Sequence, residues 1–196
     1  MKTTIKTGLA ALVLLLAISC KKESLSTPTF ASIKTEDNAA IKTGGHYIGE
    51  HFGGGVIFWI SKDSLHGLIA DTVDLGRATW WNGTYTTTGA TGIVIFSGKA
   101  NTRKIILSQG KPGSYAALLC ANYNGSGYTD WVLPSKGELN ELYKQKNIVG
   151  GFADIGYWSS TEFSYDGAWV QSFNNGFRVG YNKGADNVDV RAIRAF

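Results

Sequence analysis

The sequence predicts an α+β domain, and three observations predict it. A short apolar run after residue 55 is typical of a buried strand, helical segments follow after residue 101, and the last forty or so residues show strand patterns with turn signals between them. Strands, then helices, then strands favour an α+β domain over alternating βαβ units. Residues 45–196 number about 150, which is enough for one core and one domain.

The globular part opens with two predicted strands. Val56–Ile60 is a continuous apolar run, and Gly67–Ala70 is a second one. A turn near Asp63 and Ser64 would let the two strands pair. Residues 74–98 are rich in Thr and Gly, so we expect a long loop or irregular sheet there.

Two helices are expected next, at about Thr102–Ser108 and Ser114–Asn122, with Pro112 and its flanking glycines as the break between them. The second helix is almost entirely apolar. Its Cys120 is therefore expected to be an inert thiol in the core rather than a reactive one.

A third helix has the clearest start in the chain. Ser135 can cap the backbone, and Glu138, three residues later, can return the bond as a capping box. Leu139, Leu142 and Tyr143 would then face the core.

The C-terminal region predicts a hairpin and a final strand. Ala168–Phe173 and Phe177–Asn182 flank the sequence Asn174-Asn175-Gly176, whose residue types tolerate the positive φ angles of tight turns. Val188–Arg194 is expected to be the last strand.

The first 19 residues have the parts of a secretory signal peptide. Lys2 and Lys6 precede an apolar run over Leu9–Ile18, which is too short to span a bilayer. The sequence ending Leu16–Cys20 resembles the lipobox of bacterial lipoproteins. This resemblance implies cleavage before Cys20 and acylation of Cys20, which would anchor the chain to a membrane.

Residues 20–44 are predicted to be the lipidated cysteine and a flexible tether, because they are polar and lack a hydrophobic period. Lys21, directly after the cysteine, is similar to the residue found there in outer-membrane lipoproteins. The sequence Lys21–Glu23 is similar to a surface-export tag. We therefore expect a lipid-anchored, surface-exposed protein of the cell outer membrane.

Net charge argues against a nucleic-acid partner. The full chain carries a formal charge of +4, and two of those charges, Lys2 and Lys6, would leave with the signal peptide. Loss of Cys20 to acylation would leave Cys120 as the sole thiol, so no intramolecular disulfide is predicted.

Several ordered stretches resemble the lectin-like C-terminal domain of bacterial collagen-like adhesins, over about Tyr47 to Phe196. The stretches that match are Ile48-Gly49, Gly53–Phe58, His66–Ala70, Gly127–Ser135, Glu138-Leu139, Tyr157–Glu162, Ala168-Trp169, Phe173, Gly176 and Val190–Phe196. The resemblance implies a C-type lectin-like domain with a twisted antiparallel sheet, two to three helices and an exposed face for binding. The same ending is similar to target proteins of diversity-generating retroelements, in which this stretch is varied. Asn-rich turns explain much of its composition as well.

Within that ending, polar and aromatic side chains suggest a ligand-binding surface, because rigid aromatic area mixed with adaptable hydrogen bonding is typical of binding surfaces. An ordinary solvated hairpin has a similar composition. The predicted ligand-binding residues are Tyr165, Gln171, Asn174, Asn175, Phe177, Arg178, Tyr181 and Asn187. Trp158 and Trp169 are expected in the core.

Other side chains leave two interpretations open. Asp130 and Glu162 could each act as an acid, although each lacks an evident second carboxylate and a structural role is expected. Arg191 and Arg194 could bind an anion, or they could brace neighbouring loops.

Catalysis and metal binding find little support. One of the two cysteines would be lipidated, and all three histidines, His46, His51 and His66, lie towards the N-terminus without an evident partner. The three prolines do not form the Glu-Pro-Asn motif of calcium-dependent lectins. Asp186, Asn187 and Asp189 would supply only a partial calcium set. No enzyme activity, cofactor or metal is predicted.

The sequence therefore predicts a non-catalytic recognition module that binds a glycan or a protein on another cell, a host or a phage. The alternative is a structural or assembly lipoprotein that docks to an envelope or fimbrial complex.

Overall fold

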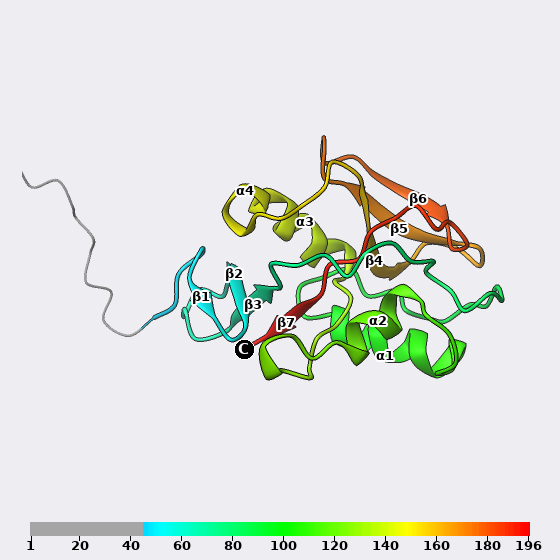
Figure 1. The fold of residues 1–196 in the computed structure, drawn as a ribbon, viewed down its shortest axis with the longest axis horizontal. Helices are drawn as coiled ribbons and strands as arrows, with labels where there is room; N and C mark the ends of the chain where they lie inside the picture. Colours follow the sequence, from blue (N-terminus) through cyan, green and yellow to red (C-terminus); the bar gives the residue numbers. More distant parts are fainter. Residues whose placement is uncertain (1–44) are drawn as a thin grey trace, which may run out of the picture. The chain divides into compact units, whose positions relative to one another are not determined.

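The computed structural model describes residues 45–196 (Figure 1). The predicted signal peptide, Cys20 and the tether lie outside the described residues. The helices are α1 (Gly98–Gln109), α2 (Ala116–Asn122), α3 (Lys136–Lys144) and α4 (Lys146–Val149), with a 3-10 turn at Gly125–Gly127. The strands are β1 (His51–Phe52), β2 (Gly55–Ile60), β3 (Gly67–Ala70), β4 (Gly156–Glu162), β5 (Gly167–Ser172), β6 (Arg178–Asn182) and β7 (Ile193–Ala195). Mixed helices and antiparallel sheets confirm the α+β class.

One sheet has the order β1-β2-β3-β7 and joins the two ends of the domain. The predicted pairing of β2 with β3 is confirmed, with Val56 opposite Ala70 and Ile60 opposite Gly67. Strand β7 then pairs antiparallel with β3, beside the N-terminal strands (Figure 1). The first and last strands of the described residues therefore lie in the same sheet.

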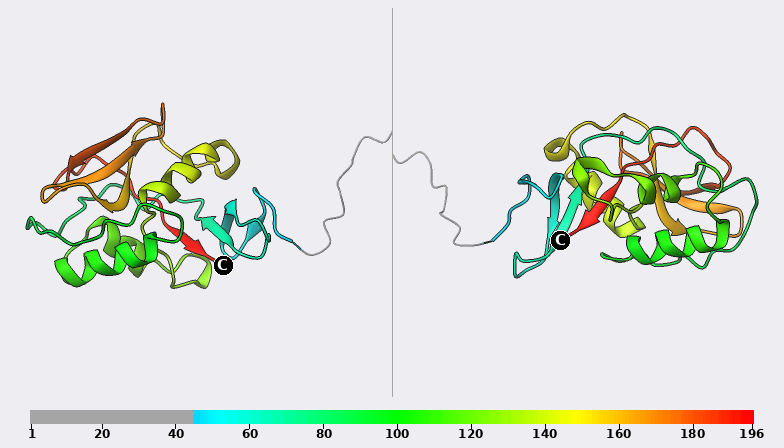
Figure 2. Two further views of the ribbon diagram at one scale, coloured as in Figure 1. Left: turned by 180° about the vertical axis from the view of Figure 1, so that it is seen from behind. Right: turned by 60° about the horizontal axis from the view of Figure 1, so that its bottom comes forward.

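The second sheet has the order β4-β5-β6 and carries the predicted hairpin. Its turn is confirmed at Asn174–Gly176, where the Gly176 amide bonds to the Ser172 carbonyl and Gly176 has a φ of 81°. Figure 2 shows this hairpin away from α1 and α2, which lie side by side. Strand β6 forms one edge of the sheet.

Strands of both sheets lie between two hydrophobic clusters. Side chains of a strand alternate between its faces, and Ile57 and Ile69 enter one cluster while Val56, Phe58 and Leu68 enter the other. This two-sided burial is why the apolar runs in β2 and β3 are continuous rather than alternating.

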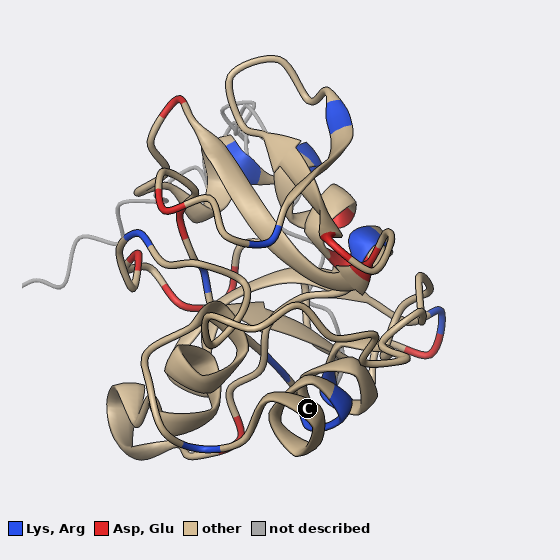
Figure 3. Ribbon diagram, turned by 90° about the vertical axis from the view of Figure 1, so that its right-hand side faces the viewer, with Lys and Arg blue, Asp and Glu red and all other residues tan. Residues whose placement is uncertain are grey.

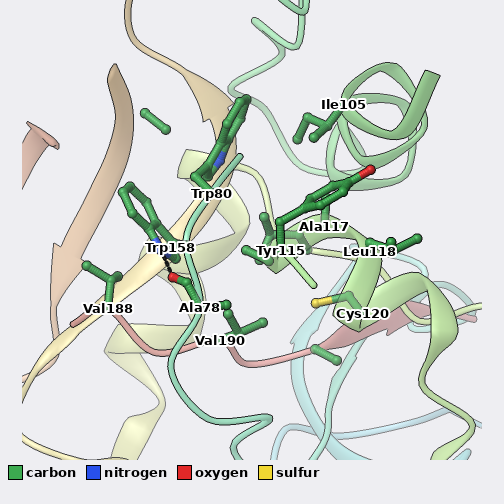
Figure 4. Packing of buried hydrophobic residues seen from close by; sticks show 14 of the residues in the cluster. Ala78, Trp80, Ile105, Tyr115, Ala117, Leu118, Cys120, Trp158, Val188 and Val190 are labelled. Atoms are coloured by element: carbon green, nitrogen blue, oxygen red, sulfur yellow. Dashed lines mark hydrogen bonds between the residues drawn. The ribbon is translucent and has the colours of Figure 1, made fainter. Parts of the chain in front are cut away.

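The larger cluster lies between α1, α2 and the second sheet (Figure 4). Trp158 is fully buried there, as predicted, and its indole nitrogen donates to the Ala78 carbonyl at 2.8 Å. Cys120 is also buried, and burial raises the pKa of its thiol well above the ordinary range. The prediction of an inert core cysteine agrees with this position.

The start of α3 forms the predicted capping box. The Ser135 hydroxyl accepts from the Glu138 amide, and the Glu138 carboxylate accepts from the Ser135 amide at 2.6 Å. The same carboxylate accepts from the Gly98 amide at 3.1 Å, so it also holds the start of α1. Burial raises the pKa of Glu138.

The final strand is shorter than predicted. Val188–Arg194 was expected to be a strand, but β7 covers Ile193–Ala195 only. The preceding segment bonds instead to the irregular loop after β3, since the amides of Leu75 and Ala78 donate to the carbonyls of Val190 and Val188 at 2.9 and 3.2 Å. Asp189, between these two residues, bonds to Gly156 and Trp158 of β4, but this is an isolated bridge and no continuous ladder forms. Helix α1 is longer than predicted at both ends.

The hairpin turn should tolerate no side chain at Gly176. A Cβ there would lie 2.6 Å from the Tyr143 ring, in addition to the cost of a positive φ. We expect Gly176→Ala to lower the free energy of unfolding by about 2 kcal/mol or more in urea denaturation. Gly127→Ala is the matched control, because Gly127 has a φ of 80° and nothing within 4 Å of the added carbon. Equal losses for both variants would show that the Tyr143 contact is unimportant.

Candidate ligand-binding surface

The predicted ligand-binding residues divide between buried and exposed positions. Gln171 is buried, contrary to the prediction, and its amide nitrogen donates to the Asn140 side chain at 3.2 Å. Helix α3 covers the hairpin at this point, so Gln171 does not lie on the candidate surface. The remaining predicted residues are all exposed: Tyr165, Asn174, Asn175, Phe177, Arg178, Tyr181 and Asn187.

These exposed residues do not form one site. Asn174 and Asn175 lie at the β5–β6 turn, whereas Tyr165 lies in the β4–β5 turn at the other end of β5. A six-residue strand is about 20 Å long. Tyr165 instead neighbours Tyr85, with 5.9 Å between the ring centroids. Asn187 lies in the loop after β6.

Strand β6 and the residue just before it, Phe177, carry a row of exposed apolar side chains on one face. Phe177, Val179 and Tyr181 alternate along the chain and therefore share a face, and they are 66%, 40% and 40% exposed. Tyr181 also lies 6.3 Å from the buried Trp158 ring. We call Phe177, Val179 and Tyr181 the β6 row. The sequence prediction included the two aromatic residues and missed Val179.

The other face of the hairpin carries a second group of aromatic and basic side chains. Trp169 is half-buried there rather than in the core as predicted. The Phe163 ring meets Trp169 edge-on at 5.0 Å and covers Gly180, where any side chain would collide with it. The Lys136 ammonium lies 3.0 Å from the centre of the Trp169 ring.

Arg178 joins this group by strand register. It pairs with Gln171 while Gly180 pairs with Trp169, so Arg178 points to the same face as Trp169. Burial, and then repulsion by Arg178, lower the pKa of Lys136. Neither cation forms a salt bridge within residues 45–196. We call Lys136, Phe163, Trp169 and Arg178 the Trp169 cluster; only Arg178 was predicted to bind.

A buried ion pair fixes the end of the hairpin that carries Tyr165. The Lys183 ammonium lies 2.6 Å from the Glu162 carboxylate, and both side chains are almost fully buried. Lys183 also donates to the carbonyls of Thr86 and Tyr165 at 2.9 and 2.8 Å. Glu162 accepts from the amides of the 88–89 segment. Glu162 is therefore a structural residue, not an exposed acid.

The other charged candidates are engaged in structural contacts. Arg191 is fully buried and donates to the Asp74 carboxylate and to the Asp71, Gly150 and Gly151 carbonyls. Arg194 donates two hydrogen bonds of 2.7 and 3.0 Å to the Asp130 carboxylate, and these bonds lower the pKa of Asp130. These contacts favour the bracing interpretation for both arginines.

Charged residues of both signs are interspersed over the ribbon in Figure 3. Across residues 45–196, no group of three or more His, Cys, Asp or Glu side chains is arranged to hold a metal ion. In the same range, no helix is long and apolar enough to cross a membrane.

Neither a scan against models of known protein families nor a search of curated proteins finds a match for this sequence. A function for the candidate surface is therefore inferred from its own side chains.

Breaking the buried ion pair should destabilise the domain strongly. Lys183→Met would leave the Glu162 carboxylate buried without its cation, and we expect the free energy of unfolding to fall by about 3–5 kcal/mol. The double variant Glu162→Gln, Lys183→Met removes both charges and should regain part of that loss. Urea denaturation of both variants measures the effect. A single-variant loss below about 1 kcal/mol would contradict the assigned role.

Proposed function

We propose that the protein is a lipid-anchored surface protein of the bacterial outer membrane whose domain binds a ligand without catalysing a reaction. The observation that supports this proposal best is the hairpin edge, where β6 exposes apolar and aromatic side chains on one face and aromatic and basic ones on the other. Exposed aromatic side chains gathered on a rigid element are typical of binding surfaces.

The ligand is a glycan or a protein on another cell, a host or a phage. Phe177 and Tyr181 offer flat apolar area for stacking, and Asn174 and Asn175 offer amides at the adjoining turn. Burying one such aromatic side chain contributes about 1.5–3 kcal/mol. The unpaired cations Lys136 and Arg178 favour a ligand that carries a carboxylate, sulfate or phosphate group at the opposite face.

We also propose that the domain is a relative of the C-type lectins and that its terminal segment is open to retroelement-driven variation. The α+β class and the two antiparallel sheets are compatible with this relationship. The segment from Phe163 to Asn187 contains the exposed residues of β6 and of both adjoining turns.

A second candidate function is docking within an envelope or fimbrial assembly, and the free edge of β6 favours it. The Ser172 amide donates to the Phe177 carbonyl, and the Lys183 amide donates to the Asp166 carbonyl. The backbone amides and carbonyls of the odd-numbered residues of β6 therefore point towards β5. The amides and carbonyls of Arg178 and Gly180 therefore point away from the sheet. Such an edge can accept an extended strand from a partner.

Ligand binding should depend on the β6 row. We expect Phe177→Ala, Tyr181→Ala to weaken binding to a glycan and cell-surface array at least tenfold, because stacking area is lost, while the melting temperature changes little. Tyr47→Ala, Leu65→Ala is the matched control, since both side chains are also exposed but lie near β1 and in the β2–β3 turn. Tyr165→Ala tests the separate β4–β5 turn.

Unchanged binding by the β6 variant would place the site elsewhere. If the protein binds nothing on the array and instead crosslinks to a protein of its own envelope, the assembly function is supported. Running the array with calcium and with a chelator tests whether a metal contributes.

Lipidation is tested separately. In cells given radiolabelled palmitate, Cys20→Ser should abolish labelling and release the protein from the membrane fraction. Cys120→Ala should retain full labelling, because Cys120 is buried in α2. Labelling of the Cys20→Ser variant would refute the anchor.

A further inference from the structure

The outer face of α1 is an exposed surface with no assigned role. The buried residues of this helix fall on one face: Gly98, Asn101, Thr102, Ile105 and Gln109. The opposite face, together with the loop before it, lines a shallow hollow of about 610 Å³. We call its lining residues the α1 patch: Phe96, Lys99, Ala100, Arg103, Lys104 and Leu107.

Large apolar side chains in this patch are exposed. Leu107 is 74% exposed, the highest value among the large apolar side chains of residues 45–196, and Phe96 is 47% exposed. Phe96 also has a φ of 68°, a strained value for a residue with a side chain. A highly exposed leucine and a phenylalanine with a strained backbone lie in one surface. This suggests that the patch is covered when the protein functions.

The same patch is strongly basic. From Leu75 to Thr129 the chain has no acidic residue, and its basic residues are Arg77, Lys99, Arg103, Lys104 and Lys111. Lys99, Arg103 and Lys104 form no salt bridge with any described carboxylate. Lys104 donates to the Gly89 carbonyl at 2.8 Å, and the neighbouring Asp130 is held by Arg194. Lys99 also interacts with Asp130 through its charge, but three basic residues against this one carboxylate, already bonded to Arg194, leave the patch with excess positive charge.

We infer that the α1 patch docks on an anionic lipid surface. Leu107 and Phe96 would enter the boundary between headgroups and acyl chains, while Lys99, Arg103 and Lys104 contact the phosphate groups. Basic side chains around exposed apolar ones are the composition of membrane-surface helices. Each basic residue close to an anionic bilayer strengthens binding roughly fivefold.

A bilayer explains the patch better than an acidic protein does. Phe96 and Leu107 are both exposed beside the basic side chains of the patch, and an anionic bilayer offers apolar depth and negative charge together. About two dozen residues separate the proposed anchor, Cys20, from Gly45, so the domain is tied closely along the chain to the proposed membrane. The docking itself does not require lipidation of Cys20.

The test uses residues 20–196 with Cys20→Ser, so that no acyl chain contributes. This chain contains the whole described domain, including both hydrophobic clusters. Its partition onto phosphatidylcholine vesicles is compared with that onto vesicles containing phosphatidylglycerol, at low and high salt. We expect binding only with the anionic lipid, and weaker binding at high salt, because salt screens the exposed charges.

Paired variants locate the contact. Arg103→Glu, Leu107→Asn should reduce partition at least tenfold. The matched control Lys62→Glu, Leu65→Asn makes the same charge reversal and the same leucine replacement in the exposed β2–β3 turn, and it should stay within twofold of the parent. Melting temperatures check that all three chains are folded.

Three outcomes would overturn the inference: no binding of the parent chain to anionic vesicles, equal binding to neutral vesicles, or equal loss in both paired variants. The first would leave an acidic protein as the partner of the patch. None of these outcomes affects ligand capture by the hairpin, which is measured without lipid.

Discussion

The fold depends on how the long segment between β3 and α1 satisfies its backbone. Residues 71–97 contain no helix or strand, yet parts of this segment are buried, and buried amides and carbonyls need partners. Backbone carbonyls within residues 183–192 supply some of them, and side chains from distant elements supply others. The Glu162 carboxylate accepts from two backbone amides of this segment. Lys183 and Arg191 each donate to one of its backbone carbonyls. The Asn101 side chain bonds to both the amide and the carbonyl of Gly92. Several of the buried polar residues thus act as substitutes for secondary structure.

Local chemistry explains what the sequence could predict. The capping box at Ser135, the Asn-Asn-Gly turn and the continuous apolar runs of β2 and β3 each depend on neighbouring residues, so their patterns are visible in the chain. Gln171 and Trp169 were placed wrongly because they share one face of β5, and α3 covers only part of that face. Alternation alone cannot show where a covering helix ends.

Lys136 and Phe163 were missed because they had no local signal. Lys136 reaches Trp169 from the first turn of α3, and Phe163 lies over Gly180 across the sheet, so neither contact follows from spacing in the sequence. The final strand was overestimated for a related reason. Its apolar alternation is real, but Val188 and Val190 pair with an irregular loop rather than with a strand. Long-range partners decided each of these cases.

Strand β6 has a consequence for how the protein can change over time. Four of its five residues are exposed and Gly180 is partly buried, while Phe173 before it and Lys183 after it are buried. Substitutions at exposed positions usually alter stability by no more than about 0.5 kcal/mol. New side chains could therefore accumulate along this strand with little loss of folded protein, which would separate the evolution of specificity from the maintenance of the scaffold.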